Sequence, residues 1–513
     1  MRCWRSILLI AGMLLVSGCV TGPALLPREQ QKTIDRAVVE YPPNFELKPF
    51  VVNLTAPAAM AFDSDWSVII AEGGTASVDP RIFGYTSTGK FFQVYPKGPV
   101  IPFSPFRTGF RIYGPIGGMI VDHGRIYVSH RDADDRGVIT SFDRDGDHKT
   151  IVADLPAEGD YGVTDLAVAP NGRIYFGVGT ATNSAVVGID NWQTGWVNDH
   201  LNFADQSYVD LKLLGYRFDT PNPRAGLFGG GEIAVTAPFQ PFGTSNQTRI
   251  RRTPNGKPSG AIYSVSPNGG DVRVDAHGIH NPRGLAFNEF GRLYFTNDGM
   301  EMRGTRPIKD DPDALLRFVP GTWYGWPDYS GDLYPISDAR FQPPVQMVIK
   351  SGYPDVSGLI DQATSGLLRP DRNTLLQAAL PSLSGAAKMD FVPGSGAFRE
   401  YRGSAIIALS GDRAPFATSG QKLLSPVGYK VVRVDLDTRQ SKDFVRNTEG
   451  VPASKLGKNV MALERPIDVK FGPDGSLYVL DFGQMEMRGG QEHVKAQSGK
   501  LFRLVPVGEV PKK

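Results

Sequence analysis

The sequence lacks the short signatures that most often reveal an enzyme. It contains no HExxH zinc motif, no phosphate-binding P-loop, no GxSxG nucleophile elbow and no paired cysteines spaced for zinc. It also lacks an excess of one charge, because 55 Lys and Arg residues stand against 53 Asp and Glu residues, without long basic runs. This balance argues against nucleic acid as the main partner.

The N-terminus has no hydrophobic run long enough for a mature transmembrane helix. The apolar residues 7–16 follow two arginines and suit a signal peptide instead. They lead into LVSGC at residues 15–19, which resembles the lipobox of bacterial lipoproteins. The resemblance implies a signal peptide over 1–18, a lipid on Cys19 and, from Val20, an outer-membrane lipoprotein facing the periplasm. The alternative is an ordinary secretory signal with an incidental cysteine.

Cysteine is scarce, since Cys3 and Cys19 are the two in the chain. Cleavage before Cys19 would remove Cys3 and leave a single cysteine, the lipid anchor, so no disulfide is expected. Stability must then come from the core, and about 490 residues can bury a large one. We expect the lipid, rather than a polybasic patch, to hold the protein at the membrane, with residues 19–45 as a tether.

Glycine and proline are plentiful, at 59 and 40 residues, which suggests many short strands and turns. One pattern recurs: an apolar strand, a tight turn, a second strand with an aromatic residue, and a Gly- or Asp-rich exit. The alternation in LAFNEFGRLYF is typical of half-buried strands. Two copies share the exit MEMRG, at 300–304 and 485–489. The six copies lie at 58–74, 117–132, 164–179, 283–299, 389–412 and 467–483.

A third strand-like segment follows several copies, as in GVITSFDRDG and GAIYSVSPNGG. A four-stranded unit repeated six times predicts an all-β fold, a six-bladed β-propeller over residues 46–508. The copies are further apart than a blade requires, so we expect long loops on one face, chiefly 180–260 and 300–385. A β-sandwich is less consistent with six copies in phase.

Two polar motifs stand out before any family is considered. DRDGD at 143–147 hints at calcium but lacks the spacing and the closing Glu of an EF-hand, so it is interpreted as a turn. His277 and His280 are the closest pair among the seven histidines and begin a blade. They are either loop residues with ordinary surface roles or part of a site.

Several segments resemble the glucose/sorbosone dehydrogenase family. They are HGIHNPRGLAF (277–287) and WYGWP (323–327), with weaker similarity at 179–191 and 465–481, so the resemblance spans residues 55–506. It implies a six-bladed propeller that holds PQQ over the central channel, usually with Ca²⁺. Such proteins oxidise a sugar hydroxyl or a hydrated aldehyde by passing hydride to the quinone, while a histidine removes the proton.

The catalytic residues of that family are only partly present. Asp160 matches the residue that orients the base, but the base position is Tyr161, and a phenol with a pKa near 10 is a poor base at neutral pH. The family's Arg-Asn-Pro reads His280-Asn281-Pro282 here. We therefore assign the base role to His280 as a hypothesis, since histidine can accept a proton at neutral pH.

The resemblance also implies a binding set, again with losses. Ile467 stands where a second cofactor arginine is expected, the family's lysine falls near Gly411, and Asp313 is followed by Ala314 instead of Glu. The residues that would bind PQQ are Asn281, Arg465, Tyr324, Asp298 and Arg413. Those that would bind Ca²⁺ are Gly299 and Met300, through their carbonyls, and Asp313.

Three functions follow from these matches and losses. The first is a lipid-anchored dehydrogenase that oxidises a sugar or aldehyde with PQQ. The second is a propeller without catalytic activity that binds a saccharide or another cell-envelope component at the same mouth. The third is a calcium-dependent lactonase, which would need Asp160, Asp298 and Asp313 to converge on one axial metal.

Overall fold

The structure is a computed structural model. The predicted signal peptide and Cys19 lie outside the residues that it describes. Within those residues, no helix has the length and apolar character needed to cross a membrane. The described residues are 22–97, 110–226, 231–245, 249–250, 256–348, 355–457 and 460–507.

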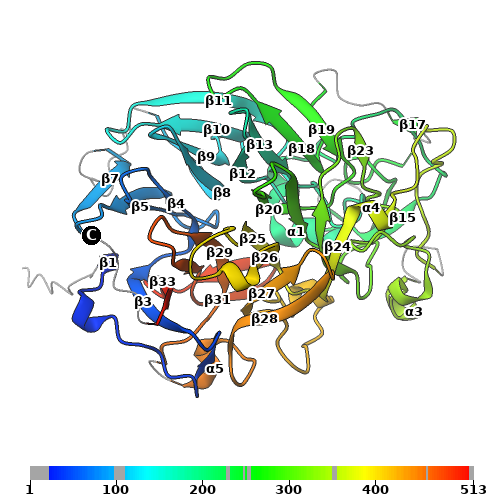
Figure 1. The fold of residues 1–513 in the computed structure, drawn as a ribbon. Helices are drawn as coiled ribbons and strands as arrows, with labels where there is room; N and C mark the ends of the chain where they lie inside the picture. Colours follow the sequence, from blue (N-terminus) through cyan, green and yellow to red (C-terminus); the bar gives the residue numbers. More distant parts are fainter. Residues whose placement is uncertain are drawn as a thin grey trace, which may run out of the picture.

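The first three blades are antiparallel sheets (Figure 1). The strands of the first two follow one another in the chain, whereas a long insertion separates the second and third strands of the third. The third sheet gains a short fifth strand, which runs parallel to its neighbour. Blade 1 comprises β4 (Pro57–Phe62), β5 (Val68–Glu72), β6 (Arg81–Tyr85) and β7 (Phe91–Tyr95). Blade 2 comprises β8 (Tyr113–Asp122), β9 (Arg125–Arg131), β10 (Gly137–Phe142) and β11 (His148–Leu155). Blade 3 comprises β12 (Val163–Val168), β13 (Ile174–Val178), β18 (Ala261–Val265), β19 (Arg273–His277) and β23 (Thr322–Trp323).

Three more sheets complete the ring, and the last two recruit strands from near the N-terminus. Blade 4 comprises β20 (Pro282–Phe287), β21 (Leu293–Asn297), β22 (Pro312–Arg317) and β24 (Leu376–Ser382). Blade 5 comprises β25 (Ala386–Phe391), β26 (Ser404–Leu409), β27 (Lys430–Asp435), β28 (Gln440–Asn447) and β2 (Val39–Glu40). Blade 6 comprises β29 (Pro466–Phe471), β30 (Leu477–Asp481), β33 (Gly499–Pro506), β3 (Phe45–Leu54) and β1 (Ala24–Leu25).

The six blades close into a ring around one axis, which confirms the predicted six-bladed β-propeller. The innermost strand of each blade contacts those of its two neighbours, in the cyclic order β4, β8, β12, β20, β25, β29 and back to β4. All six copies of the sequence repeat supply the two inner strands of a blade. Closure depends on β3, which pairs with β33, so segments from opposite parts of the chain share blade 6 (Figure 1).

The expected tether over residues 19–45 needs a correction in its described part. Strands β1 and β2 extend the outer edges of blades 6 and 5, and the 3₁₀ helix η1 (Arg28–Gln30) lies between them. Ile34 and Val39 are buried in the cluster between these two blades. The apolar side chains in this segment thus bind it to the propeller, so it does not act as a free spacer.

The core consists of hydrophobic layers between neighbouring blades. Among the described residues, six clusters fill the six interfaces; between blades 2 and 3, for example, Ile139 packs with Phe176. The prediction of half-buried strands was therefore wrong for inner strands such as β21, which is buried along its whole length. In a propeller both faces of a blade are covered, so alternation does not mark a solvent side.

The two long insertions pack against each other beside blades 3 and 4. Leu211 and Phe218 of the first share a hydrophobic cluster with Trp326, Ile336 and Leu359 of the second. The elements outside the blades are α1 (Ile189–Thr194), α2 (Trp196–Asp199), β14 (Leu211–Lys212), β15 (Phe218–Pro221), β16 (Ile233–Thr236), β17 (Arg249–Ile250), η2 (Ala339–Phe341), α3 (Val345–Val348), α4 (Arg372–Leu375), η4 (Arg399–Tyr401), η5 (Phe416–Thr418), α5 (Ala453–Leu456), β31 (Met485–Arg488) and β32 (Gln491–Val494).

Candidate functional site

Each innermost strand has a register shift near its start, where it pairs with the second strand of its blade. Such bulges re-aim side chains and are common at the rims of closed sheets. Here one residue from each shifted segment lines the same axial cavity. These six residues are Ala58, Gly117, Thr164, Arg283, Ala387 and Ile467. Five are small or apolar, so Arg283 brings charge to this ring, and Lys388, next to Ala387 in the same shifted segment, brings a second positive charge to the cavity.

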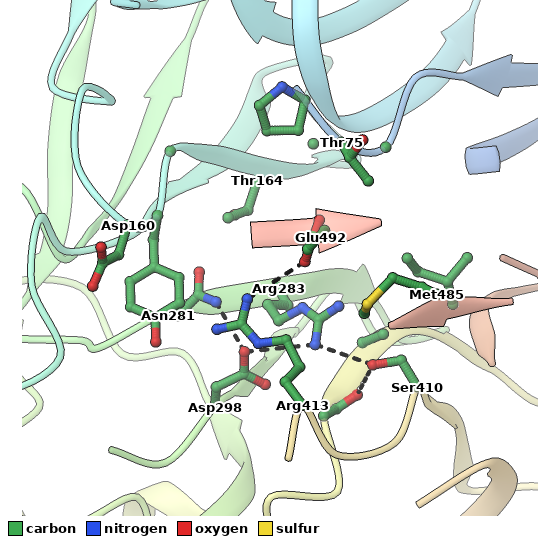
Figure 2. Close-up of a pocket in the computed structure, with 18 of the residues that line it drawn as sticks. Thr75, Asp160, Thr164, Asn281, Arg283, Asp298, Ser410, Arg413, Met485 and Glu492 are labelled. Carbon is green, nitrogen blue, oxygen red and sulfur yellow. Dashed lines mark hydrogen bonds and ion pairs between the residues drawn. The ribbon is translucent and has the colours of Figure 1, made fainter. Parts of the chain in front are cut away.

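The cavity above this ring has a volume of about 610 Å³ and is enclosed by loops from several blades and by the β31–β32 hairpin (Figure 2). Its size lies within the usual range for small-molecule sites. Its charges balance among the described lining residues. The cationic residues are Arg131, Arg283, Arg303, Lys388, Arg413 and Arg465, and the acidic ones are Asp160, Asp298, Glu301, Asp313, Asp412 and Glu492.

Most of the predicted site residues meet at this cavity, although they come from distant parts of the chain. Three do not line it: His280, Tyr324 and Met300. Those that do are Asp160, Tyr161, Asn281, Asp298, Gly299, Asp313, Arg413 and Arg465.

A buried guanidinium, Arg303, organises one wall of the cavity. Its Nη2 donates to Asp160 at 2.8 Å, its Nη1 to Asp190 at 2.5 Å and its Nε to Glu301 at 2.5 Å. Asp160 also accepts hydrogen bonds from the Trp196 indole at 2.8 Å and from two further side chains near α1. Asp160 therefore orients Arg303 and the helical insertion, whereas the resemblance implies that it orients a base.

The wall beside Arg303 is a chain of alternating charges. Glu301 accepts from Arg303 and pairs with Arg413 at 3.4 Å, and Arg413 in turn pairs with Glu492 of β32 at 3.5 Å. Burial would raise the pKa of Glu301, but the guanidiniums of Arg413 and Arg303 outweigh it and lower that pKa to about 2. Glu301 is thus charged at neutral pH, and it ties the 300–304 loop to the 411–413 loop.

Tyr161 and His280 pack together, but neither has the properties of an accessible base. Burial raises the pKa of Tyr161 above its usual value, so its hydroxyl, 3.4 Å from Nη2 of Arg303, keeps its proton. The His280 ring centroid lies 4.9 Å from that of Tyr161, and its Nδ1 is 3.0 Å from the Asp298 carbonyl oxygen. Burial lowers the pKa of His280 to about 4. His280 is therefore neutral but lies behind the cavity wall.

Asn281, Arg283 and Asp298 form the polar centre of the cavity (Figure 2). Asn281 Nδ2 donates to Asp298 Oδ2 at 2.9 Å, and Arg283 Nη1 lies 3.6 Å from the same oxygen. Asp298 Oδ1 and Asn281 Oδ1 are buried and have no hydrogen-bond partner in the described structure. Nε of Arg131, which also lines the cavity, is likewise buried without a partner. Three such atoms around one cavity point to a ligand that both donates and accepts hydrogen bonds.

Two of the predicted binding residues, Arg465 and Asp313, already form hydrogen bonds with other parts of the protein. Arg465 donates through Nη1 to the carbonyl oxygens of Ser410, Gly411 and Asp412, at 3.0 to 3.3 Å. Asp313 accepts from the Gly299 amide at 2.9 Å and, through its other oxygen, from a hydroxyl and an amide of the 384–386 turn. Both side chains hold the loops that shape the cavity.

Tyr324 and Met300 do not line the cavity, and the side chains of both are buried in the core. The Tyr324 hydroxyl donates to the Arg317 carbonyl oxygen at 2.8 Å, and its ring packs against Phe295. Met300 is buried in the cluster between the insertions, and its amide donates to Asp311 at 2.7 Å. The Tyr324 side chain of the WYGWP segment therefore packs in the core instead of lining the axial cavity.

Sequence reasoning missed Arg303, Glu301, Arg283, Lys388 and Arg131. Two signals were present. The repeated MEMRG exit contains Glu301 and Arg303, and alignment of the six repeats places Arg283 at the bulge position that faces the axis. Lys388 follows another bulge residue; it is buried and donates to the Ala58 carbonyl oxygen at 2.9 Å.

No group of three or more His, Cys, Asp or Glu side chains in the described ranges is arranged to hold a metal ion. The DRDGD segment forms a strand-connecting turn, in which the Asp147 amide donates to the Asp143 side chain at 2.9 Å. Its interpretation as a turn is confirmed.

Comparison with known proteins shows the fold. No protein-family model matches the sequence, and no curated protein matches it. The holo form of the pyranose dehydrogenase PQQ domain from Coprinopsis cinerea matches with a TM-score of 0.50 and 14% identity, over 92% of this chain and 98% of that one. The calcium structure of a family AA12 carbohydrate-active enzyme from Trichoderma reesei matches with a TM-score of 0.50 and 13% identity, over 93% and 99%.

A PQQ-bound aldose sugar dehydrogenase from Streptomyces coelicolor has a TM-score of 0.46 and 14% identity, over 91% of this chain and 99% of that one. The Coprinopsis cinerea structure, a pyranose dehydrogenase PQQ domain, is of the kind that the sequence motifs resemble. At these identities the likeness establishes the six-bladed propeller, and the chemistry has to be argued from the residues.

Proposed function

We propose that the protein is a dehydrogenase that oxidises a sugar or aldehyde hydroxyl in the axial cavity, with PQQ as the acceptor. The observation that carries this proposal is the set of three unpartnered buried atoms, Asn281 Oδ1, Asp298 Oδ1 and Arg131 Nε, around one cavity. Two are acceptors and one is a donor, and sugar hydroxyls can satisfy both kinds. The structural neighbours make PQQ the cofactor to test first.

The cationic residues of the cavity fit an anionic quinone. PQQ carries three carboxylates, and Arg303 and Arg465 are already committed to protein oxygens. Arg283 and Lys388 each have a single hydrogen bond in the described structure, to the Ser410 hydroxyl and to a carbonyl oxygen. With Arg131, whose Nε has no partner, these two are the residues that would hold the carboxylates. Bound PQQ would supply a two-electron acceptor for the hydride of the sugar C–H bond.

Asp298 is the best-placed proton acceptor in this site. Its side chain lines the cavity, its Oδ1 is buried without a partner, and burial raises the pKa of its carboxyl above the usual range, which makes it a stronger base than an exposed aspartate. The O–H bond of the sugar would break with its proton on the Asp298 carboxylate, while the C–H electron pair leaves as hydride and a carbonyl forms. This assignment replaces His280, which does not reach the cavity.

Calcium fits less well than expected. Both carboxylate oxygens of Asp313 accept hydrogen bonds from the protein. A carboxylate that is saturated by amide and hydroxyl donors offers little to a cation. We therefore assign no step to calcium.

The proposal is tested with PQQ, a sugar panel and an artificial electron acceptor. The full-length protein is expected to bind PQQ in a calorimetric titration, to show the absorption of the bound quinone and to reduce the dye. Asp298→Asn should keep PQQ binding and lower kcat by about 10²–10⁴-fold, the usual contribution of a general base. His280→Asn is the matched control and should retain activity. A large loss in His280→Asn with none in Asp298→Asn would restore the histidine as the base.

A saccharide-binding protein without catalytic activity is the second candidate. The equal numbers of cationic and acidic lining residues favour it, since many of these charges satisfy each other, and so does the protonated Tyr161. Binding of sugar without any binding of PQQ would favour this function over oxidation.

We also propose that a lipid on Cys19 anchors the protein in the outer membrane, on its periplasmic side. The lipobox-like LVSGC supports this location. Mass spectrometry of the N-terminal peptide would identify the lipid, and Cys19→Ala should move the protein from the membrane fraction to the soluble fraction.

A further inference from the structure

A second cavity lies directly behind the wall that Arg303 forms. Its volume is about 470 Å³, and α1, β15, the 303–305 loop and the 415–420 loop enclose it. It shares four lining residues with the axial cavity: Arg303, Phe416, Met487 and Gly490. The two spaces therefore adjoin at these four residues, and Arg303 lines both.

Two buried polar atoms at this second cavity have no partner in the described structure, Asp190 Oδ1 and Thr305 Oγ1. Their residues are only 4% and 8% exposed, so bulk water does not satisfy them. They lie at one corner, because a Cβ added at Gly188 would be 3.2 Å from the first and 1.9 Å from the second. A carboxylate beside a hydroxyl is an arrangement that can hold two hydroxyl groups of one ligand.

The rest of the lining indicates what kind of ligand this is. Among the described lining residues the charged ones are Asp190, Asp219 and Arg303, and Arg303 is shared with Asp160 and Glu301, so the net charge disfavours an anion. Ile189, Met347, Phe416 and Met487 add apolar surface. Polar atoms at one corner and apolar surface elsewhere suit a neutral sugar ring, which has hydroxyls at its edge and C–H groups on its faces.

We propose that the second cavity is a sugar subsite continuous with the axial cavity, so that the ligand is a neutral oligosaccharide of at least two rings. This inference rests on the proposed function, because it takes the axial cavity as the site of the reacting ring. The second ring would extend past Phe416 and Met487 and place hydroxyls on Asp190 and Thr305.

The test is calorimetric and does not depend on turnover. The full-length protein is titrated with glucose, cellobiose and cellotriose, and in parallel with maltose and maltotriose. We expect the two-ring sugar of one series, cellobiose or maltose, to bind at least tenfold more tightly than glucose. Equal affinity for one and two rings in both series would overturn the subsite and leave the axial sugar site in place. No binding of any sugar would overturn the proposed function as well.

Thr305→Val removes the unpartnered hydroxyl and preserves the shape of the side chain. We expect the affinity for the two-ring sugar to fall about threefold to tenfold, the value of one hydrogen bond, with no change for glucose. Thr438→Val, the same change on the exposed β27–β28 turn, is the matched control and should alter neither affinity. An unchanged two-ring affinity in a folded Thr305→Val protein would contradict the subsite.

Discussion

The two MEMRG segments have the same sequence and opposite environments. In the first, Glu301 and Arg303 lie 2.5 Å apart with side chains 11% and 2% exposed. In the second, Glu486 and Arg488 lie 2.6 Å apart with side chains 69% and 68% exposed, on a hairpin at the cavity rim. Nearly identical ion pairs therefore have different consequences: the buried pair organises the cavity wall, whereas the exposed pair is screened by water.

The sharpest way to break this comparison is to remove each arginine. Arg303→Met leaves Asp160, Asp190 and Glu301 buried without their shared cation, which should cost about 3–5 kcal/mol of unfolding free energy. Arg488→Met is the control and should leave the unfolding midpoint unchanged, because its partner is exposed. Chemical denaturation measures both. Equal losses would show that burial does not distinguish the pairs.

The glycines that end the two MEMRG segments, Gly304 and Gly489, also differ in their surroundings. Gly304 and Gly489 both have positive φ, but a Cβ on Gly304 would lie 2.5 Å from the Asp190 carboxyl group, whereas Gly489 has no atom within 4 Å of that position. Gly489→Ala should cost about 1 kcal/mol from the backbone alone. Gly304→Ala should cost about 1–3 kcal/mol more, because the added methyl displaces Asp190. Similar melting temperatures for the two variants would mean that the Asp190 contact is not tight.

Acid unfolding gives a third, smaller contrast. The pKa of Glu301 is about 2 in the folded protein, below the value near 4.3 expected when unfolded. The folded state thus binds fewer protons in this window, so Glu301 stabilises the protein above about pH 5, and that contribution is lost as the pH falls toward 2. Glu301→Gln should flatten this decline in melting temperature, whereas Glu486→Gln should follow the wild-type curve. A wild-type acid decline in Glu301→Gln would refute the assignment.

The fold was predictable because each blade repeats one local pattern, and six copies of that pattern marked all the inner strands. The recruitment of residues 24–54 to blades 5 and 6 was not, because β1 and β2 are two residues long and β3 pairs with a strand more than 400 residues away. Local patterns carry little information about such distant partners.

The position of the cavity could be predicted from the sequence, but the contacts of the residues that line it could be predicted only in part. Asp160 and Asp298 could be located from their blades, whereas the preference of Asp160 for Arg303 depends on a pairing 143 residues away. Tyr324 illustrates the opposite error, since a residue in a family-like motif proved to be a core side chain. Which oxygen lacks a partner, as Asp298 Oδ1 does, is a property of packing that no sequence pattern reveals.

The pairing of β3 with β33 has a consequence for biogenesis. Blade 6 obtains its third strand from residues 499–506 and its fourth from residues 45–54. During synthesis, blades 1 to 4 can form in order. Strand β3, however, has no edge to pair with until β33 has been made. The ring can therefore close only after translation has passed residue 506, and until then the unpaired edge is a site where a chaperone could bind or an aggregate could begin.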